Sequence, residues 1–317
     1  MLTHKKISVV TPCFNEEENV EQLINEVLIE FNKLNLPFEH IFIDNSSRDR
    51  TVEILRSLSK KFSHIRVIVN ARNFGHIRSP YYGLMQAQGD AVILLAADLQ
   101  DPPSVIPELI KKWQEGHDAV IAIKNQSLET PLMFLIRKIY YNLINKLADI
   151  ELAKNYTGFG LYDQKIITAL KKLNDPYPYF RGLIFELTGS IAKVYYTQPK
   201  RLRGITKNNF FTLYDIAMLG ICSHSKIPLR IATMAGFLLS LLSLLVAFGY
   251  GVVKLIFWDK IPLGIAPLIV GLFFLFSVLL LFIGIIGEYI GFIYTKVNSL
   301  PLVIEKERIN FNSVENP

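Results

Sequence analysis

The 317-residue sequence has only two cysteines, Cys13 and Cys222, so a fold held together by disulfides is excluded and a reducing compartment is expected. It has no cysteine and histidine spacing typical of a zinc site, no RNA-binding signature and no long run of lysine and arginine. We therefore do not expect a nucleic-acid partner, although the net charge is +6. Attraction to anionic lipid head groups explains the positive excess.

Charged side chains are also absent from two long stretches, Ile231–Val253 and Ile261–Ile286. Each exceeds the roughly 20 residues that a helix needs to cross the hydrocarbon core of a membrane. We therefore expect two transmembrane helices joined by a short loop. No signal peptide precedes the first predicted strand, and basic residues flank the spans, so we expect the large amino-terminal half and both termini in the cytoplasm.

Strand and helix patterns alternate through the first 125 residues. The predicted strands are Ile7–Thr11, Glu39–Ile43, Arg66–Val69, Ala91–Ala96 and Ala119–Ile123. The predicted helices between them are Glu16–Phe31, Thr51–Phe62, His76–Gln88 and Val105–Glu115. This alternation is typical of an α/β fold with a doubly wound, mostly parallel sheet. In such folds the loops at the carboxyl ends of the strands form the site.

The order of elements is less regular after residue 125. We predict a helix over Leu132–Leu147, a strand over Thr157–Tyr162 and a second short helix beyond it, all completing the same domain. The stretch Asn209–Cys222 is apolar on most sides and lies between two lysines. This pattern is typical of a helix lying on the membrane surface, although an ordinary packed helix would show it too. The final residues, Glu305–Pro317, have the composition of a polar tail.

Three predicted loops at strand ends carry groups suited to a nucleotide. The candidate residues are Thr11, Pro12, Asn15 and Glu16 where the first strand turns into its helix, Asp44 and Ser46 at the end of the second strand, and Arg72 after the third. Free backbone N–H groups and carboxylates can meet a base or a ribose, whereas Arg72 offers paired donors to a diphosphate. Gly75 allows close backbone approach. We interpret Asp49 as a helix cap, and ordinary helix starts would use several of the same residue types.

A fourth loop lies within the stretch Leu94–Pro103, which reads LLAADLQDPP. An apolar run that ends in clustered carboxylates indicates a buried strand with oxygen ligands at its carboxyl end. Asp98 and Gln100 are the candidate ligands, with Asp101 beside them, and Mg²⁺ or Mn²⁺ prefers such oxygens. The alternative is a helix start carrying acidic residues before its prolines.

Taken together, these motifs resemble a known family, the inverting glycosyltransferases of family 2 with a GT-A fold. Within it, the polyisoprenyl-phosphate enzymes, namely bactoprenol glucosyltransferases and dolichol-phosphate mannose synthases, are the most similar. The resemblance covers nearly the whole chain. Its residues are VVTPCFNEEENV (9–20), DNSSRDRT (44–51), RNFGH (72–76), ADLQDPP (97–103), TGFGLYD (157–163), RG (181–182), RLRGITK (201–207), PLR (228–230) and GEYIGFIY (287–294).

The resemblance implies a metal-dependent enzyme that moves a single sugar, glucose in the first instance, from a UDP-sugar to undecaprenyl or another polyprenyl phosphate. It implies nucleoside binding by Pro12, Glu16 and Asp44, and metal and diphosphate binding by Asp98 and Gln100. It places Arg201, Arg203 and Lys207 on the donor or lipid phosphates, and Arg137 on the acceptor side. Asp98, Arg203 and Lys207 are the expected catalytic residues.

The sequence departs from the family pattern at two positions that concern the site. Ala96 stands where relatives commonly have the first aspartate of Asp-Ala-Asp, and Phe159 stands where bactoprenol glucosyltransferases often have an aspartate. The chain therefore offers no acid at position 159 to serve as a general base. Two alternatives stay open: a GDP-mannose-using mannose synthase, and a membrane scaffold that has lost turnover.

This interpretation divides the chain into four parts. We expect a GT-A catalytic domain over 1–204, an interfacial helix region over 205–228, two transmembrane helices over 229–296 and a cytoplasmic tail over 297–317. The expected location is the cytoplasmic membrane. Exposed aromatic and small residues on the spans would suit a homo-oligomer.

Overall fold

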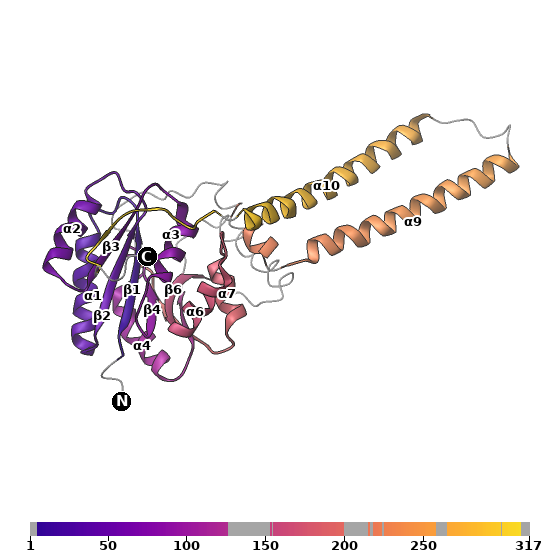
Figure 1. The fold of residues 1–317 in the computed structure, drawn as a ribbon. Helices are drawn as coiled ribbons and strands as arrows, with labels where there is room; N and C mark the ends of the chain where they lie inside the picture. The colour runs from indigo at the N-terminus through magenta and orange to yellow at the C-terminus, as the bar shows by residue number, and fades with distance from the viewer. Residues whose placement is uncertain are drawn as a thin grey trace.

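A computed structural model describes residues 5–125, 153, 155–199, 215, 218–223, 225–257, 265–298 and 300–311. Its strands are β1 (Ile7–Cys13), β2 (Phe38–Asp44), β3 (Ile65–Asn70), β4 (Ala91–Leu94), β5 (Ala119–Lys124), β6 (Tyr156–Asp163), β7 (Ile191–Tyr196) and β8 (Glu305–Ile309). The α-helices are α1 (Val20–Leu34), α2 (Thr51–Lys61), α3 (Gly75–Met85), α4 (Ile106–Gln114), α6 (Gln164–Leu173), α7 (Phe180–Leu187), α9 (Ile227–Ile256) and α10 (Ile265–Val297), and a 3₁₀ turn, η1 (Pro103–Val105), precedes α4. Figure 1 shows a sheet domain from which α9 and α10 extend as two long helices.

The described strands form one sheet of eight in the order β7-β5-β6-β4-β1-β2-β3-β8. Strands β1 to β4 are parallel to their neighbours among themselves, and β5 is parallel to β7, which confirms the predicted mostly parallel α/β sheet. The sequence predicted β6 as a strand but did not predict its position in the sheet. β6 runs antiparallel between β4 and β5. Gly160 permits this insertion, because a Cβ there would lie 2.5 Å from the Val120 carbonyl oxygen.

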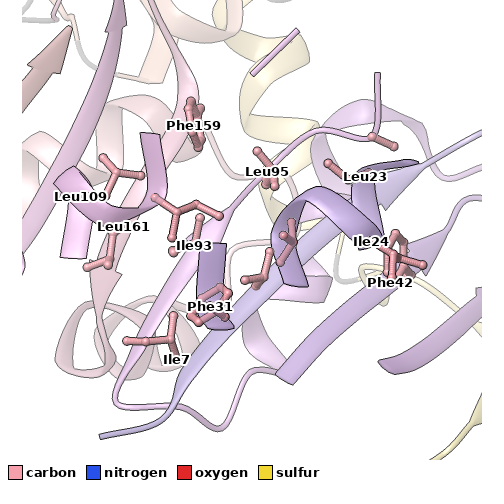
Figure 2. Packing of buried hydrophobic residues seen from close by; sticks show 14 of the residues in the cluster. Ile7, Leu23, Ile24, Phe31, Phe42, Ile93, Leu95, Leu109, Phe159 and Leu161 are labelled. Carbon is pink, nitrogen blue, oxygen red and sulfur yellow. The ribbon is translucent and has the colours of Figure 1, made fainter. Parts of the chain in front are cut away.

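Helices cover both faces of the sheet, so its central strands are apolar on both sides. In β1, Val9 faces the cluster formed with α1, α2 and α4, whereas Val10 faces the cluster formed with α3, α6 and α7. Figure 2 shows the first cluster, in which Phe31 of α1 and Leu109 of α4 pack near Ile93 of β4. This double burial fixes the sheet and therefore the position of the loops at its carboxyl edge.

In the described part of the chain, one helical segment is long and apolar enough to cross a membrane. This segment, Gly271–Val297 of α10, has 27 residues and a mean hydropathy of 2.4. The apolar stretch of α9 covers only Ile227–Ser243 among the described residues. Length and composition therefore support the second of the two expected spans, and two clear spans are not established.

The expected polar tail needs a correction, because Glu305–Ile309 forms an edge strand, β8, antiparallel to β3. Its sequence, EKERI, lacks the alternation of apolar and polar residues that predicts a strand, because four of its five side chains are charged. Charged side chains are common on edge strands, where they face water and discourage further pairing. Arg56 of α2 forms a two-pronged ion pair with Glu307, and the chain that follows α10 thus returns to the sheet domain.

Three sequence expectations fall outside the described residues. These are the helix over Leu132–Leu147, most of the stretch Asn209–Cys222, and the end of the tail beyond residue 311.

Candidate active site

A cavity of about 380 Å³ lies at the carboxyl ends of β1 and β4. Helix α3, strand β6 and the start of α7 form its other walls. The polar and charged residues that line it are His76, Tyr81, Asp98, Gln100, Asp101, Lys124, Thr157, Tyr179 and Arg181. Of the sequence-predicted site residues, Pro12, Asp98 and Gln100 line this cavity. The cavity therefore lies at the edge of the sheet where the strand-end rule predicts a site.

The turn that carries Asp98 and Gln100 has an unusual backbone. Leu99, between them, has a φ of 57° in the left-handed region, which disfavours residues with a Cβ. Its side chain is buried in the first hydrophobic cluster, while its two neighbours line the cavity. The backbone N–H of Gln100 donates to Oδ1 of Asp98 at 3.3 Å, which closes the turn.

Asp101 lies deeper in the wall of the same cavity, with only 6% of its surface exposed. Burial raises the pKa of this carboxyl, although the Tyr196 hydroxyl, which donates to Oδ1, and the charge of Lys124 oppose that shift. Burial and the neighbouring carboxylate raise the pKa of Tyr196 as well, so its hydroxyl stays protonated. Sequence reasoning found Asp101 but missed Lys124 and Tyr196, which come from distant strands.

The donor set at this turn fits a hard divalent cation only in part. Asp98 and Gln100 supply one carboxylate and one amide oxygen to the cavity, and Ala96 supplies none. No group of three or more His, Cys, Asp or Glu side chains that could hold a metal occurs among the described residues. Because Mg²⁺ and Mn²⁺ sites often combine one or two protein carboxylates with substrate phosphates and water, the set is compatible with an ion shared with a diphosphate.

The loops after β1 and β2 lie side by side and are bonded to each other. Asn15 donates its backbone N–H to Oγ of Ser47 at 2.8 Å, and its Oδ1 accepts from the N–H of Arg48 at 2.8 Å. Asp44 is fully buried and accepts from the backbone N–H of Ser47 at 2.9 Å. Burial raises the pKa of Asp44, and its hydrogen bonds with Ser47 limit the rise.

Further contacts settle the positions of the other residues expected here. The Glu16 backbone N–H donates to Thr51 Oγ1 at 2.8 Å. Arg50, and not Asp49, is the N-cap residue of α2, but Asp49 still accepts from the N–H of Thr51, the first residue of the helix, at 3.0 Å. Ser46 has a φ of 65° within the turn. The Thr11 side chain points into the core, with Oγ1 at 2.9 Å from Nε2 of His40, and the residue is fully buried, so its hydroxyl does not face the site.

Asn45 organises the loop after β3. Its Oδ1 accepts from the backbone N–H of Phe74 at 2.8 Å, and its Nδ2 donates to Oδ1 of Asn73 at 2.9 Å. Arg72 itself is exposed, and its guanidinium lies over the Phe74 ring at 4.2 Å. The structure therefore places Arg72 on the surface beside the site rather than in the cavity wall. Sequence reasoning did not predict this role for Asn45. The available signal was its amide side chain, which directly follows Asp44 at the end of a predicted strand.

Two cationic side chains and a histidine reach the cavity from three elements. Lys124 ends β5, Arg181 lies in the first turn of α7, and His76 lies in the first turn of α3. The burial of its ring and the charge of Arg181 lower the pKa of His76. The four residues expected to bind phosphates, Arg137, Arg201, Arg203 and Lys207, lie outside the described residues.

A second cavity, of about 650 Å³, lies against the face of α10 that carries Gly284, Gly287, Glu288 and Gly291. Leu219 lines both cavities, so the two adjoin. The first cavity therefore adjoins a second one that is lined by the carboxyl-terminal part of α10.

Comparisons with known proteins give related sequences and a related fold. Residues 8–170 match the family described as "Glycosyl transferase family 2". The chain is 35% identical to the "Uncharacterized glycosyltransferase sll0501" of Synechocystis sp., with 94% of each chain covered. It is also 35% identical to the "SfII prophage-derived bactoprenol glucosyl transferase" of Shigella flexneri, over 95% of this chain and 98% of that protein.

Among solved structures, the glucosyl-3-phosphoglycerate synthase of Mycobacterium tuberculosis in complex with Mn²⁺, uridine diphosphate and phosphoglyceric acid is similar with a TM-score of 0.51. The two share 22% identity over 70% of this chain and 78% of that one. This likeness supports the GT-A-like arrangement of the sheet.

Proposed function

The chain belongs to glycosyl transferase family 2, and on that premise we propose that it transfers one sugar, glucose in the first instance, from a UDP-sugar to a polyprenyl phosphate. The observation that carries this proposal is the pair of adjoining cavities. One holds Asp98 and Gln100 at the edge of the sheet, and the other lies against the apolar helix α10, with Leu219 between them. A water-soluble donor and a lipid acceptor can thus meet at one place.

The donor nucleoside binds at the loops after β1 and β2. Pro12, Glu16 and Asp44 supply the contacts to base and ribose. The bonds from Asn15 to the Ser47 hydroxyl and the Arg48 backbone N–H hold the two loops together before the donor arrives. Pre-formed loops reduce the ordering cost of binding. A glucosyl group and a bactoprenol acceptor are supported by the bactoprenol glucosyl transferases to which the chain is similar.

The diphosphate lies at the Asp98 turn. Asp98 and Gln100 would hold a Mg²⁺ or Mn²⁺ ion there, and a bound ion would supply positive charge to stabilise the leaving diphosphate. Lys124 and Arg181 face the same cavity and attract the anionic groups of both substrates. Arg201, Arg203, Lys207 and Arg137 are proposed to add to this positive field.

The reaction is an in-line displacement. An oxygen of the acceptor phosphate forms a bond to the anomeric carbon while the bond from that carbon to the UDP oxygen breaks, so the configuration inverts and UDP leaves with the electron pair. A phosphate monoester has a second pKa of about 6 and is mostly anionic at neutral pH, so no protein base is needed. This agrees with Phe159, whose side chain cannot accept a proton. Positioning and electrostatics supply most of the rate.

We propose that α9 and α10 form a hairpin that crosses the membrane twice, with the sheet domain on the cytoplasmic side. The chain leaves the sheet domain before α9 and rejoins its sheet through β8 after α10, which supports an even number of crossings. We keep the four-part division as a proposal with one change, because β8 belongs to the sheet of the catalytic domain.

The test is transfer of labelled sugar to undecaprenyl phosphate by the purified full chain in detergent with Mn²⁺ or Mg²⁺. UDP-glucose, other UDP-sugars and GDP-mannose are offered in parallel. Labelled lipid from a UDP-sugar supports the proposal, and labelled lipid from GDP-mannose alone replaces it with a mannose synthase. Absence of product from every donor, with nucleotide binding intact, favours a scaffold. The surface variant Glu53→Gln serves as a matched protein control.

A further inference from the structure

The turn that presents Asp98 and Gln100 adopts a conformation that its own sequence does not favour. Leucine at position 99 has a φ of 57°, and no glycine or asparagine stands there to relieve the strain. Such a conformation persists only where surrounding contacts fix it. Contacts on both sides of Leu99 should therefore determine whether its neighbours face the cavity.

One such contact lies within the turn and one reaches across the sheet. The bond from the Gln100 N–H to Asp98 closes the turn locally, at 3.3 Å. On the far side, the Tyr196 hydroxyl donates to the buried carboxylate of Asp101. Tyr196 ends β7, and the order β7-β5-β6-β4 separates it from β4, which precedes the turn, by two strands.

Packing holds the Tyr196 ring in place for this bond. Only 4% of Tyr196 is exposed, and its ring meets Phe159 of β6 edge-on, with centroids 5.5 Å apart and an interplanar angle of 89°. Both rings belong to the same hydrophobic cluster as Leu99. Figure 2 shows Phe159 at one end of this cluster, in the region of Leu95. The packing of the Tyr196 ring therefore holds its hydroxyl in position to donate to Asp101.

We propose that Tyr196 is a positioning residue: by holding Asp101, its hydroxyl fixes the left-handed turn at Leu99 and so keeps Asp98 and Gln100 directed toward the metal and the donor diphosphate. This inference rests on the proposed function for its ligands. Tyr196 touches neither substrate in this scheme. It also stands five residues before Arg201, so the same bond joins the donor turn to the strand that leads into the proposed phosphate-binding segment.

The test compares Tyr196→Phe with Tyr195→Phe in the full chain. Each variant loses one hydroxyl from β7, but Tyr195 is 60% exposed and is the matched control. The first readout is hydrogen exchange of the peptide covering residues 95–103 without ligand. The second is the Mn²⁺ concentration that gives half of the thermal stabilisation by UDP.

For Tyr196→Phe we expect faster exchange confined to residues 95–103. We also expect about a tenfold higher Mn²⁺ requirement, since a hydrogen bond to a charged group is lost. Tyr195→Phe should match the wild type in both readouts. Asp101→Asn keeps an acceptor for the Tyr196 hydroxyl and should stay closer to the wild type than Tyr196→Phe does.

Two results would overturn the proposal. One is a Tyr196→Phe protein that matches Tyr195→Phe in exchange. The other is faster exchange throughout the sheet domain, which would mean that the hydroxyl contributes only general stability. If the wild type shows no Mn²⁺-dependent stabilisation by UDP, the proposed function fails, and the exchange experiment still decides the role of Tyr196.

Discussion

Lys296, in the last turn of α10, forms an ion pair with Asp175, which lies in the segment just before α7. The same ammonium donates to the carbonyl oxygen of Tyr177 at 3.1 Å. Residues 178–181, which follow directly, line the first cavity. A short stretch of backbone, residues 175–178, thus joins the carboxyl-terminal end of α10 to the wall of the candidate active site.

The first prediction concerns this junction. Lys296→Met should lower transfer to the lipid about fivefold, because a partly exposed ion pair contributes ~1 kcal/mol and its loss frees the cavity wall from α10. UDP affinity should fall less than transfer does, because the loops after β1 and β2 are held by their own hydrogen bonds, which do not involve Lys296. Lys306→Met, at an exposed lysine of β8, is the control. A variant that loses UDP binding together with transfer would contradict this division of roles.

The second prediction concerns Asp98. Asp98→Asn removes the only carboxylate that the Asp98–Gln100 pair offers to a cation, so we expect transfer to fall by about three orders of magnitude or more. Thermal stabilisation by UDP should lose its dependence on Mn²⁺, while the melting temperature without ligand stays close to that of the wild type. Near-normal turnover in this variant would remove Asp98 from the metal site.

Asp98 and Gln100 were accessible to sequence reasoning because one rule locates them. Parallel strands buried on both faces are continuous apolar runs, and polar residues that end such a run lie at the carboxyl edge of the sheet. The same periodicity predicted β1 to β5 to within a few residues. Lys124 and Tyr196 escaped because they end β5 and β7, and periodicity does not say which strands are neighbours.

Two other misses have physical causes of their own. Thr11 belongs to the strand rather than to the loop, and its hydroxyl is satisfied in the core by His40. β8 carries charges at four of five positions, and contacts distant in the sequence, such as its pairing with β3 and its ion pair with Arg56, make it a strand. In both cases tertiary contacts outweigh the local signal.

The third prediction concerns the pH dependence of stability. Burial lowers the pKa of His40 to about 3 from its ordinary 6.5, so the folded protein keeps this ring neutral where the unfolded chain binds a proton. His40 therefore favours folding above pH 6.5, and this advantage is lost progressively as the pH falls toward 3. Between pH 6.5 and pH 5 the loss should reach about 2 kcal/mol.

His40→Gln should flatten this part of the stability profile, because glutamine does not titrate and can still bond to Thr11. Denaturant unfolding at several pH values measures the difference, and carboxylates contribute equally to both proteins. His117→Gln is the control for a histidine outside the sheet core. Parallel profiles for His40→Gln and the wild type would show that His40 takes up a proton in the folded state.

The fourth prediction concerns the docking of β8. Asn310 follows this strand with a φ of 61°, and its Nδ2 donates to the carbonyl oxygen of Ile65 at 2.6 Å and of Ser63 at 3.2 Å. Asn310→Ala should lower the free energy of unfolding by about 2 kcal/mol, because these bonds are lost and alanine disfavours a left-handed backbone. Asn310→Gly removes the same bonds without the backbone cost, so it should be the less destabilised of the two. Equal losses would assign the whole effect to the hydrogen bonds, and no loss in either variant would show that β8 is held without Asn310, by contacts such as its backbone pairing and the Arg56–Glu307 ion pair.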